Sequence, residues 1–317
     1  MTQRSRARRS VLAVPGSSTR FLEKARGLPA DEVFLDLEDA VAPDAKPAAR
    51  RNVIAALASG GWGGKVRAVR VNGATSRWAH RDVIEIVEQA GPHLDVIVLP
   101  KVSGAAQVHW LDLLLGQAEQ AAGLPAGQTG IEAQIEDARG LAAVDEIAAA
   151  SPRLEALVFG PADFMASVGM RSLRIGVPPP GYAGDAFGYP KMRMLVAARS
   201  RGLQAVDGPH AVIADLDGLR RSAAEAAALG YDGKWVLHPG QIDVVNEAFS
   251  PGQDDYDRAE LILAAYDYYT RVEGRGAAML DGEMIDEASR KLAEVAAARG
   301  RAAGLRPGTS FEPPARG

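Results

Sequence analysis

The chain has 317 residues, 47% hydrophobic and 24% charged, so it is long enough to bury a sizeable core and has the composition of a soluble globular protein. Its formal net charge of −4 excludes a globally basic nucleic-acid binder. The absence of cysteine excludes disulfides and thiolate metal sites, and with only five histidines any metal site would use mainly oxygen ligands, which Mg²⁺ prefers.

The N-terminal residues 1–9 are basic, like the start of a secretory signal, but the apolar run that follows is short. It covers Val11–Val14 and is stopped by Pro15-Gly16. A secretory signal needs about 7–15 apolar residues, and a membrane span needs about 18 or more. The sequence therefore predicts a cytoplasmic protein with neither a signal peptide nor a membrane-spanning segment.

Short apolar runs alternate with amphipathic, alanine-rich segments over residues 1–250. The runs are almost continuously apolar, as in parallel strands that are covered on both faces. Eight such units predict an α/β fold of the (β/α)₈ TIM-barrel type, and the alternative of an open doubly wound sheet lacks its G-x-G-x-x-G signature. The predicted strands are Ser10–Pro15, Glu32–Leu37, Val66–Val71, Asp95–Pro100, Gly130–Ile135, Leu154–Phe159, Leu203–Val206 and Lys234–Leu237; the predicted helices include Ala48–Ala58, Arg81–Gln89, Ala105–Ala122, Leu141–Ala150, Met192–Arg201 and Leu216–Leu229.

Two regions depart from this repeating pattern. Ser172–Pro190 is a Pro/Gly-rich insertion after the sixth strand, and an insertion of that length is usually functional or mobile. Residues 251–317 form a predicted C-terminal helical extension with a helix over Asp254–Val272, a break at Glu273–Ala277, a helix over Glu283–Ala303 and a frayed end. A barrel does not need these helices, so we expect them to cap it or to reach a neighbouring subunit.

In a barrel of this type the active site lies at the C-terminal ends of the strands. Glu136 and Asp163 stand at the ends of the fifth and sixth predicted strands, which are neighbours. Two unpaired carboxylates would repel each other, whereas a divalent cation shared between them removes that cost. The sequence therefore predicts that Glu136 and Asp163 hold a metal ion, with a structural ion pair as the alternative for either residue.

Other charged residues end neighbouring strands. Arg70 offers a fixed positive charge that could stabilise an enolate or a carboxylate, or could pair with Glu38 or Asp39. Glu38 and Asp39 could in turn hold metal-bound water or position Arg70. Lys101 admits a Schiff-base role but is more typical of an ion-pair partner, and His238 is either an acid/base group or a hydrogen-bonded loop residue.

Basic residues follow the first two strands and could hold the phosphates of a large anionic cofactor. Arg20 and Lys24 lie in the helix that opens after Ser17, and Lys46 and Arg50 follow the second strand. Amide groups at a helix N-terminus also favour anions. The alternative is a solvated helix face.

These motifs, in this order, resemble the citrate lyase beta subunit/malyl-CoA lyase family of the HpcH/HpaI aldolase superfamily. The resemblance runs from about Arg9 to about Ala303 and rests on eight motifs at eight strand ends. They are SSTRFLEKA (17–25), FLDLEDAV (34–41) with Lys46 and Ala49-Arg50, RVN (70–72), LPK (99–101), QIE (134–136), FGPAD (159–163), DGP (207–209) and HPGQ (238–241).

The resemblance implies a barrel with C-terminal helices, assembled as a homotrimer or homohexamer. It implies cleavage or formation of malyl-CoA, β-methylmalyl-CoA or citramalyl-CoA, giving acetyl-CoA or propionyl-CoA plus glyoxylate or pyruvate. Mg²⁺, or Mn²⁺, would sit on Glu136 and Asp163, with Arg70 at the thioester or enolate oxygen. Asp286 would act as acid/base in a neighbouring subunit, although its motif reads Met284-Ile-Asp-Glu-Ala288 where the family has Ile-Asp-Met-Pro.

Three other functions are compatible with parts of this pattern. One is a malyl-CoA thioesterase that shares the metal and coenzyme A sites. Another is a coenzyme A-independent, metal-dependent 2-keto acid aldolase, which the basic residues Arg20 and Lys24 argue against. The third is a non-catalytic acyl-CoA-binding subunit, which the metal carboxylates and Arg70 argue against. No nucleic-acid or membrane partner is expected.

Overall fold

The computed structural model describes residues 6–177, 181–182 and 184–313. It divides the chain into two compact units, Met1–Phe249 and Ser250–Gly317, each with its own internal contacts. Part of the predicted insertion Ser172–Pro190, the first residues of the basic N-terminus and the last residues of the C-terminal end lie outside the described residues.

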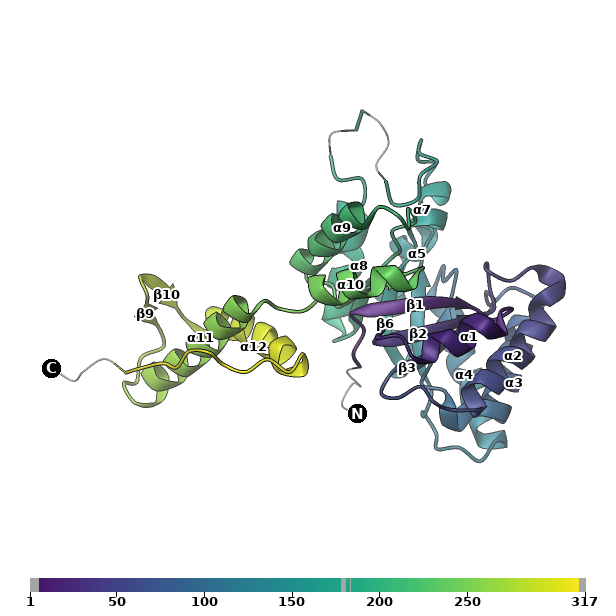
Figure 1. Ribbon diagram of the computed structural model, residues 1–317, viewed down its shortest axis with the longest axis horizontal. Coiled ribbons are helices and arrows are strands. Elements are labelled where there is room, and N and C mark those ends of the chain that lie inside the picture. Colours follow the sequence, from purple (N-terminus) through teal and green to yellow (C-terminus); the bar gives the residue numbers. More distant parts are fainter. Residues whose placement is uncertain (1–5, 178–180, 183, 314–317) are drawn as a thin grey trace. The chain divides into compact units, whose positions relative to one another are not determined.

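The first unit is a closed barrel of eight strands within the described residues (Figure 1). Each strand pairs in parallel with its neighbours, and β1 pairs with both β2 and β8 to close the ring. This confirms the predicted TIM barrel, with strand ends that differ from prediction by at most one residue. The strands are β1 (Ser10–Pro15), β2 (Glu32–Asp36), β3 (Val66–Arg70), β4 (Val96–Leu99), β5 (Gly130–Ile135), β6 (Leu154–Phe159), β7 (Gln204–Asp207) and β8 (Gly233–Val236).

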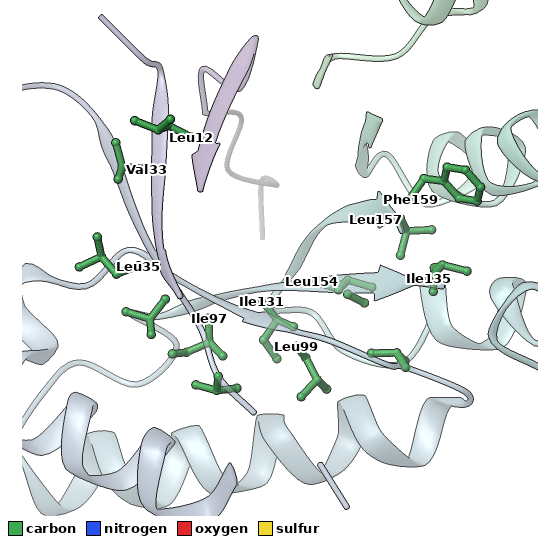
Figure 2. Close-up of a cluster of buried hydrophobic side chains, with 14 of the residues drawn as sticks. Leu12, Val33, Leu35, Ile97, Leu99, Ile131, Ile135, Leu154, Leu157 and Phe159 are labelled. Atoms are coloured by element: carbon green, nitrogen blue, oxygen red, sulfur yellow. The ribbon is translucent and has the colours of Figure 1, made fainter. Parts of the chain in front are cut away.

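Two apolar layers hold the barrel together, because alternate side chains of a strand point to opposite faces. Figure 2 shows leucine, isoleucine, valine and phenylalanine side chains from β1, β2, β4, β5 and β6 that belong to the larger cluster. A second buried cluster, which includes Val11, Phe34, Val98 and Trp235, uses the alternate strand positions. Burial on both faces explains why the strands read as continuous apolar runs in the sequence.

Helices follow most strands and carry the chain back to the start of the next one. Two of them, α5 and α6, replace the single helix predicted over Leu141–Ala150, and α8 begins inside the predicted insertion. The helices are α1 (Thr19–Arg26), α2 (Lys46–Ala58), α3 (Ala79–Ala90), α4 (Ala105–Ala121), α5 (Ala138–Ala142), α6 (Val144–Ala148), α7 (Pro161–Ser167), α8 (Gly188–Ser200), α9 (Leu216–Leu229) and α10 (Ile242–Ala248), with short 3₁₀ turns η1 (Pro43–Ala45), η2 (Gly91–His93) and η3 (Pro239–Gln241).

Arg8 connects several strands through buried ion pairs before β1 begins. Its fully buried guanidinium donates to Glu32 on β2 at 2.9 Å, to Glu132 on β5 at 2.6 Å and to Glu155 on β6 at 2.6 Å. These carboxylates come from early positions of their strands, away from the strand ends that carry the predicted active site. The basic N-terminal segment therefore has a structural role in this unit.

The C-terminal unit contains helix α11 (Gln253–Arg271), a short antiparallel hairpin and helix α12 (Glu287–Ala302). The hairpin, β9 (Ala278–Leu280) with β10 (Glu283–Ile285), corrects the prediction of a helix from Glu283. Its turn is Asp281-Gly282, with φ of 52° and 85° at the two residues. Asp-Gly with both residues at positive φ is a strong hairpin signal, which the helical interpretation of this stretch overlooked.

Across the described ranges, no helix is both long enough and apolar enough to cross a bilayer.

Candidate active site

The C-terminal ends of the strands enclose a cavity of about 260 Å³ that gathers four of the charged residues predicted from the sequence. Its lining includes Arg70 from the end of β3, Glu136 just after β5, and Asp163 in the first turn of α7. Asp39, from the segment after β2, also lines it. The barrel therefore brings the two predicted metal ligands and the predicted anion-binding arginine to one cavity.

Glu136 is held in place by hydrogen bonds to both of its carboxylate oxygens. The backbone N–H of Lys101 donates to Oε1 at 2.6 Å, and the side-chain amide of Gln134 donates to Oε2 at 2.6 Å. Burial, together with the negative charge of Asp163 beside it, raises the pKa of Glu136 to about 9. Without a cation the Glu136 carboxyl is therefore protonated at neutral pH, and a bound cation would take the place of that proton.

Gly160 provides the space that Glu136 occupies. A Cβ atom at position 160 would overlap Glu136 Cβ, and it would lie 2.6 Å from Glu136 Oε2 and 3.0 Å from Gln134 Nε2. The backbone of Gly160 has φ of −103°, which any residue can adopt, so the requirement for glycine here is steric. The glycine before α7 is thus part of the site.

The donor set fits a hard divalent cation. Glu136 and Asp163 offer carboxylate oxygens. In the absence of a cation, burial and the neighbouring Asp163 charge disfavour the ionised form of Glu136. In the part of the chain that the structure describes, no three histidine, aspartate or glutamate side chains gather as a complete ligand set. A cation held by two carboxylates keeps its other positions for water or substrate oxygens, as Mg²⁺ commonly does.

Arg70 is fixed by carboxylates on one side and by aromatic rings on the other. Its Nε and Nη2 donate to the two oxygens of Asp36, both at 2.7 Å, and its Nη1 lies 3.3 Å from Glu38 Oε2. The guanidinium carbon lies 5.5 Å from the Phe34 ring and 5.4 Å from the Trp235 ring. Since a guanidinium has five N–H groups, these contacts leave two for a ligand in the cavity.

Lys101 forms ion pairs with both acidic residues that follow β2. Its ammonium contacts Glu38 Oε1 and lies 3.0 Å from Asp39 Oδ1. Partial burial disfavours the ammonium charge, but the two carboxylates outweigh burial and raise the pKa of Lys101. A lysine held protonated is poorly suited to Schiff-base chemistry, so the ion-pair interpretation agrees with the structure.

His238 lies at the start of η3 as a hydrogen-bonded loop residue. Its Nδ1 accepts from the N–H of Gly240 at 3.1 Å, and the side chain of Gln241 reaches back to the backbone N–H of His238 at 3.2 Å. His238 also lines a second cavity, described next. In this arrangement the imidazole caps a turn, which is the second of the two roles considered for it.

A second cavity of about 260 Å³ adjoins the first, since both are lined by Ala13, Val14, Pro15 and Leu237. It is largely apolar and is also lined by Lys24 and the half-exposed ring of Phe21, both on α1. Arg20 is an exposed residue of the same helix. Two of the predicted phosphate-binding residues thus lie at or near this cavity.

The other two predicted phosphate-binding residues are placed differently. Lys46 is 6% exposed, and its ammonium donates to the carbonyls of Leu37 and Glu38, both at 2.9 Å. Arg50 is 4% exposed and pairs with Asp82 and Glu85. Both cations are engaged inside the protein, so the structure does not offer them to a phosphate. The sequence shows their charge but not their carboxylate and carbonyl partners.

Asp286 lies in the C-terminal unit, at the N-terminus of α12. Its Oδ1 accepts hydrogen bonds from the backbone N–H groups of Ala288 at 2.9 Å and Ser289 at 3.0 Å. These bonds lower the pKa of Asp286, so it is a carboxylate at neutral pH. Asp286 therefore caps α12 through Oδ1, which leaves Oδ2 for other chemistry.

Three residues of the site were missed as functional residues. Asp36 orients Arg70, Gln134 orients Glu136, and the Trp235 ring packs on Arg70. Asp36 and Arg70 are register partners on adjacent strands, so strand pairing is the signal that could have identified Asp36.

The chain is similar to known proteins along most of its length. Residues 9–239 match the HpcH/HpaI aldolase/citrate lyase family. An L-malyl-CoA/beta-methylmalyl-CoA lyase from Cereibacter sphaeroides is 41% identical over 300 residues, covering 92% of this chain and 94% of that protein. A (3S)-malyl-CoA thioesterase from the same species is 36% identical over 280 residues, covering 88% and 89%.

Solved structures are similar along most of the chain. CitE from Mycobacterium tuberculosis, in complex with magnesium, acetoacetate and coenzyme A, is 30% identical with a TM-score of 0.72, covering 92% of this chain and 97% of that one. A citrate lyase from Burkholderia xenovorans matches with a TM-score of 0.81 at 21% identity, which shows the fold alone. The family match over most of the barrel and the relative at 41% identity lead to one conclusion: the chain belongs to the HpcH/HpaI aldolase/citrate lyase family.

Proposed function

We propose that this protein is a Mg²⁺-dependent carbon–carbon lyase that cleaves or forms a 3-hydroxyacyl-CoA such as malyl-CoA, β-methylmalyl-CoA or citramalyl-CoA. The observation that carries the proposal is the meeting of Glu136, Asp163 and Arg70 at one cavity. A relative that is 41% identical along nearly its whole length is a malyl-CoA/β-methylmalyl-CoA lyase. The products would be acetyl-CoA or propionyl-CoA and glyoxylate or pyruvate.

Glu136 and Asp163 would hold the Mg²⁺ ion, with Mn²⁺ as a substitute. The bound ion would act as a Lewis acid on the oxygen atoms of the 2-keto acid. The protein keeps the Glu136 carboxylate in one orientation through the Lys101 N–H and the Gln134 amide. Such fixed orientation lets the site bind the cation without rearrangement.

Arg70 would stabilise the negative charge that develops on the thioester oxygen. In the direction of synthesis, the acyl-CoA loses a proton from its α-carbon and becomes an enolate, whose carbon attacks the keto carbon. Two N–H groups of Arg70 remain after its contacts with Asp36 and Glu38, and they would donate to that oxyanion. Because Asp36, Phe34 and Trp235 fix the guanidinium, little reorganisation accompanies the reaction.

Asp286 of a neighbouring copy would exchange the proton with the α-carbon. The family resemblance supports this role. The capping hydrogen bonds lower the pKa of Asp286, so the group is ionised and able to accept a proton. Glu38 and Asp39 would assist by holding Arg70 and Lys101 in place. This role for Asp286 requires an oligomer, and we propose a homotrimer or homohexamer.

Arg20 and Lys24 would bind the phosphates of coenzyme A, while the apolar second cavity would take a less polar part of the molecule. Lys24 lines that cavity, and the cavity shares four residues with the one that holds the metal carboxylates. A thioester that spans the two would reach the reacting centre. Acyl-CoA thioesters are made and used inside cells, so we place the enzyme in the cytoplasm.

A thioesterase is the second candidate, because a 36% identical relative is a (3S)-malyl-CoA thioesterase. The deciding assay incubates acetyl-CoA or propionyl-CoA with glyoxylate, pyruvate or oxaloacetate, with Mg²⁺ or with EDTA, and identifies products by mass. The lyase proposal expects a condensed acyl-CoA in Mg²⁺ only, and its loss in Glu136→Gln and Asp163→Asn. Full activity in EDTA, or no condensation with any pair, would refute it.

A further inference from the structure

Lys101 stands at a backbone position that favours glycine. Its φ is 55°, and among the described residues only Asp281 is another non-glycine residue at positive φ. This conformation directs the N–H of Lys101 toward Glu136 Oε1. Glycine would adopt the same backbone with less strain, so the lysine side chain has a role of its own at this position.

The lysine side chain contacts a different pair of acids. It contacts Glu38 Oε1 and Asp39 Oδ1, while Arg70 lies against the other oxygen of Glu38. Both oxygens of Glu38 are therefore in contact with positively charged side chains. Glu38 is 5% exposed, and both of its cationic partners adjoin the metal site: the Lys101 N–H donates to Glu136, and Arg70 lines the same cavity as Glu136. Glu38 is therefore a further carboxylate close to the proposed metal ligands.

A third carboxylate would be harmful if it reached the cation. Mg²⁺ and Mn²⁺ prefer six oxygen ligands, and each extra carboxylate strengthens binding but occupies a coordination position. A 2-keto acid that chelates the cation through its carboxylate and keto oxygens needs two adjacent open positions. Retaining Glu38 on Lys101 and Arg70 keeps such positions open.

We propose that Lys101 is a positioning residue that holds Glu38 and Asp39 away from the cation bound by Glu136 and Asp163, and thereby reserves coordination positions for the keto acid. This inference rests on the proposed metal site. It assigns the side chain of Lys101 a role distinct from that of its backbone N–H, which orients Glu136.

Lys101→Met tests the proposal, because it removes the ammonium and keeps the backbone N–H. Titration of the substrate-free protein with Mn²⁺ should show binding about tenfold tighter than in the wild type. Glyoxylate binding to the Mn²⁺-saturated variant should weaken, so KM for glyoxylate rises more than kcat falls. Lys101→Arg, which restores a positively charged side chain, should return the affinities for Mn²⁺ and for glyoxylate toward wild-type values. If Lys101 only stabilised the fold, its removal would lower the melting midpoint without weakening glyoxylate binding to the Mn²⁺-saturated protein.

The loss of the Lys101 positive charge would by itself also favour Mn²⁺ binding. A double-variant cycle separates this electrostatic effect from the release of a competing carboxylate. In a Glu38→Gln/Asp39→Asn background, Lys101→Met should change Mn²⁺ affinity by less than about twofold, because both competing ligands are gone. Equal gains in both backgrounds would overturn the proposal, as would weaker Mn²⁺ binding in folded Lys101→Met. Thermal unfolding checks that each variant is folded. A wild-type protein that binds no Mn²⁺ would instead refute the proposed metal site itself.

Discussion

The glycine before α7 gives the sharpest single-atom test of the site. In Gly160→Ala the new methyl group would overlap Glu136 Cβ and would lie 2.6 Å from Glu136 Oε2. Glu136 cannot move freely, because the Lys101 N–H and the Gln134 amide hold both of its oxygens. Either these hydrogen bonds break or the backbone at position 160 shifts.

The expected cost has two parts. Overpacking a tightly packed region typically destabilises a protein by about 1–3 kcal/mol, and each kcal/mol lowers the melting midpoint by about 2–4 °C at this domain size. We therefore expect the midpoint of Gly160→Ala to fall by about 2–12 °C. Displacement of a metal-orienting group typically costs about 10–100-fold in metal affinity, so Mn²⁺ binding should weaken by a similar factor.

Calorimetric titration with Mn²⁺ and a thermal melt in EDTA measure the two effects separately. Gly73→Ala is the matched control, because a Cβ there would meet only Lys101 Cβ at 3.9 Å and Pro100 O at 4.0 Å, which are ordinary contacts. The control should retain its midpoint and its Mn²⁺ affinity. If Gly160→Ala binds Mn²⁺ as tightly as the control does, the assignment of Glu136 as a metal ligand fails.

Three further predictions follow from buried or capping charges. Arg8→Met leaves three carboxylates without their buried arginine partner and should destabilise the protein by about 3–5 kcal/mol in chemical denaturation. The exposed ion pair of Arg220 should contribute less than about 1 kcal/mol. A small loss of stability in Arg8→Met would contradict the structural role of Arg8. Asp286→Ala removes the cap of α12 and should lower the melting midpoint of the C-terminal unit, while Asp286→Asn should retain the cap and still lose turnover. Full turnover in the asparagine variant would exclude acid/base chemistry there. In EDTA, the stability of the folded protein should fall as pH rises from about 5 to about 9. The reason is that folded Glu136, with its pKa of about 9, holds a proton that the unfolded chain releases near pH 4.3. Glu136→Gln should flatten this pH dependence of the melting midpoint, and an unchanged slope would show that another group causes it.

The sequence predicts the barrel well because covered parallel strands have a distinctive pattern of continuous apolar runs. Rules for this fold then place Glu136, Asp163 and Arg70 at one end of it, where the structure has them. The partners of these residues are less visible, because hydrogen bonds depend on strand register and on backbone turns. The left-handed turn at Lys101, which directs its N–H to Glu136, has no sequence signature.

Lys46 and Arg50 are residues whose partners the sequence also does not reveal. Their spacing from the second strand suggests a phosphate site, but burial and carboxylate or carbonyl partners engage both charges. Burial of a charged side chain depends on the helix face that packs against the barrel, and α2 has little segregation of apolar and polar residues to reveal that face. Whether a charged side chain is free to bind a ligand or is engaged inside the protein is therefore what sequence patterns predict least well here.

In the proposed reaction this site breaks a carbon–carbon bond with a cation held by Glu136 and Asp163. Mass analysis of the products formed from malyl-CoA tests it directly. With Mg²⁺ the wild-type protein should yield acetyl-CoA and glyoxylate, and Glu136→Gln should yield neither. Malate and free coenzyme A as the only products, or unchanged cleavage by Glu136→Gln, would contradict the account.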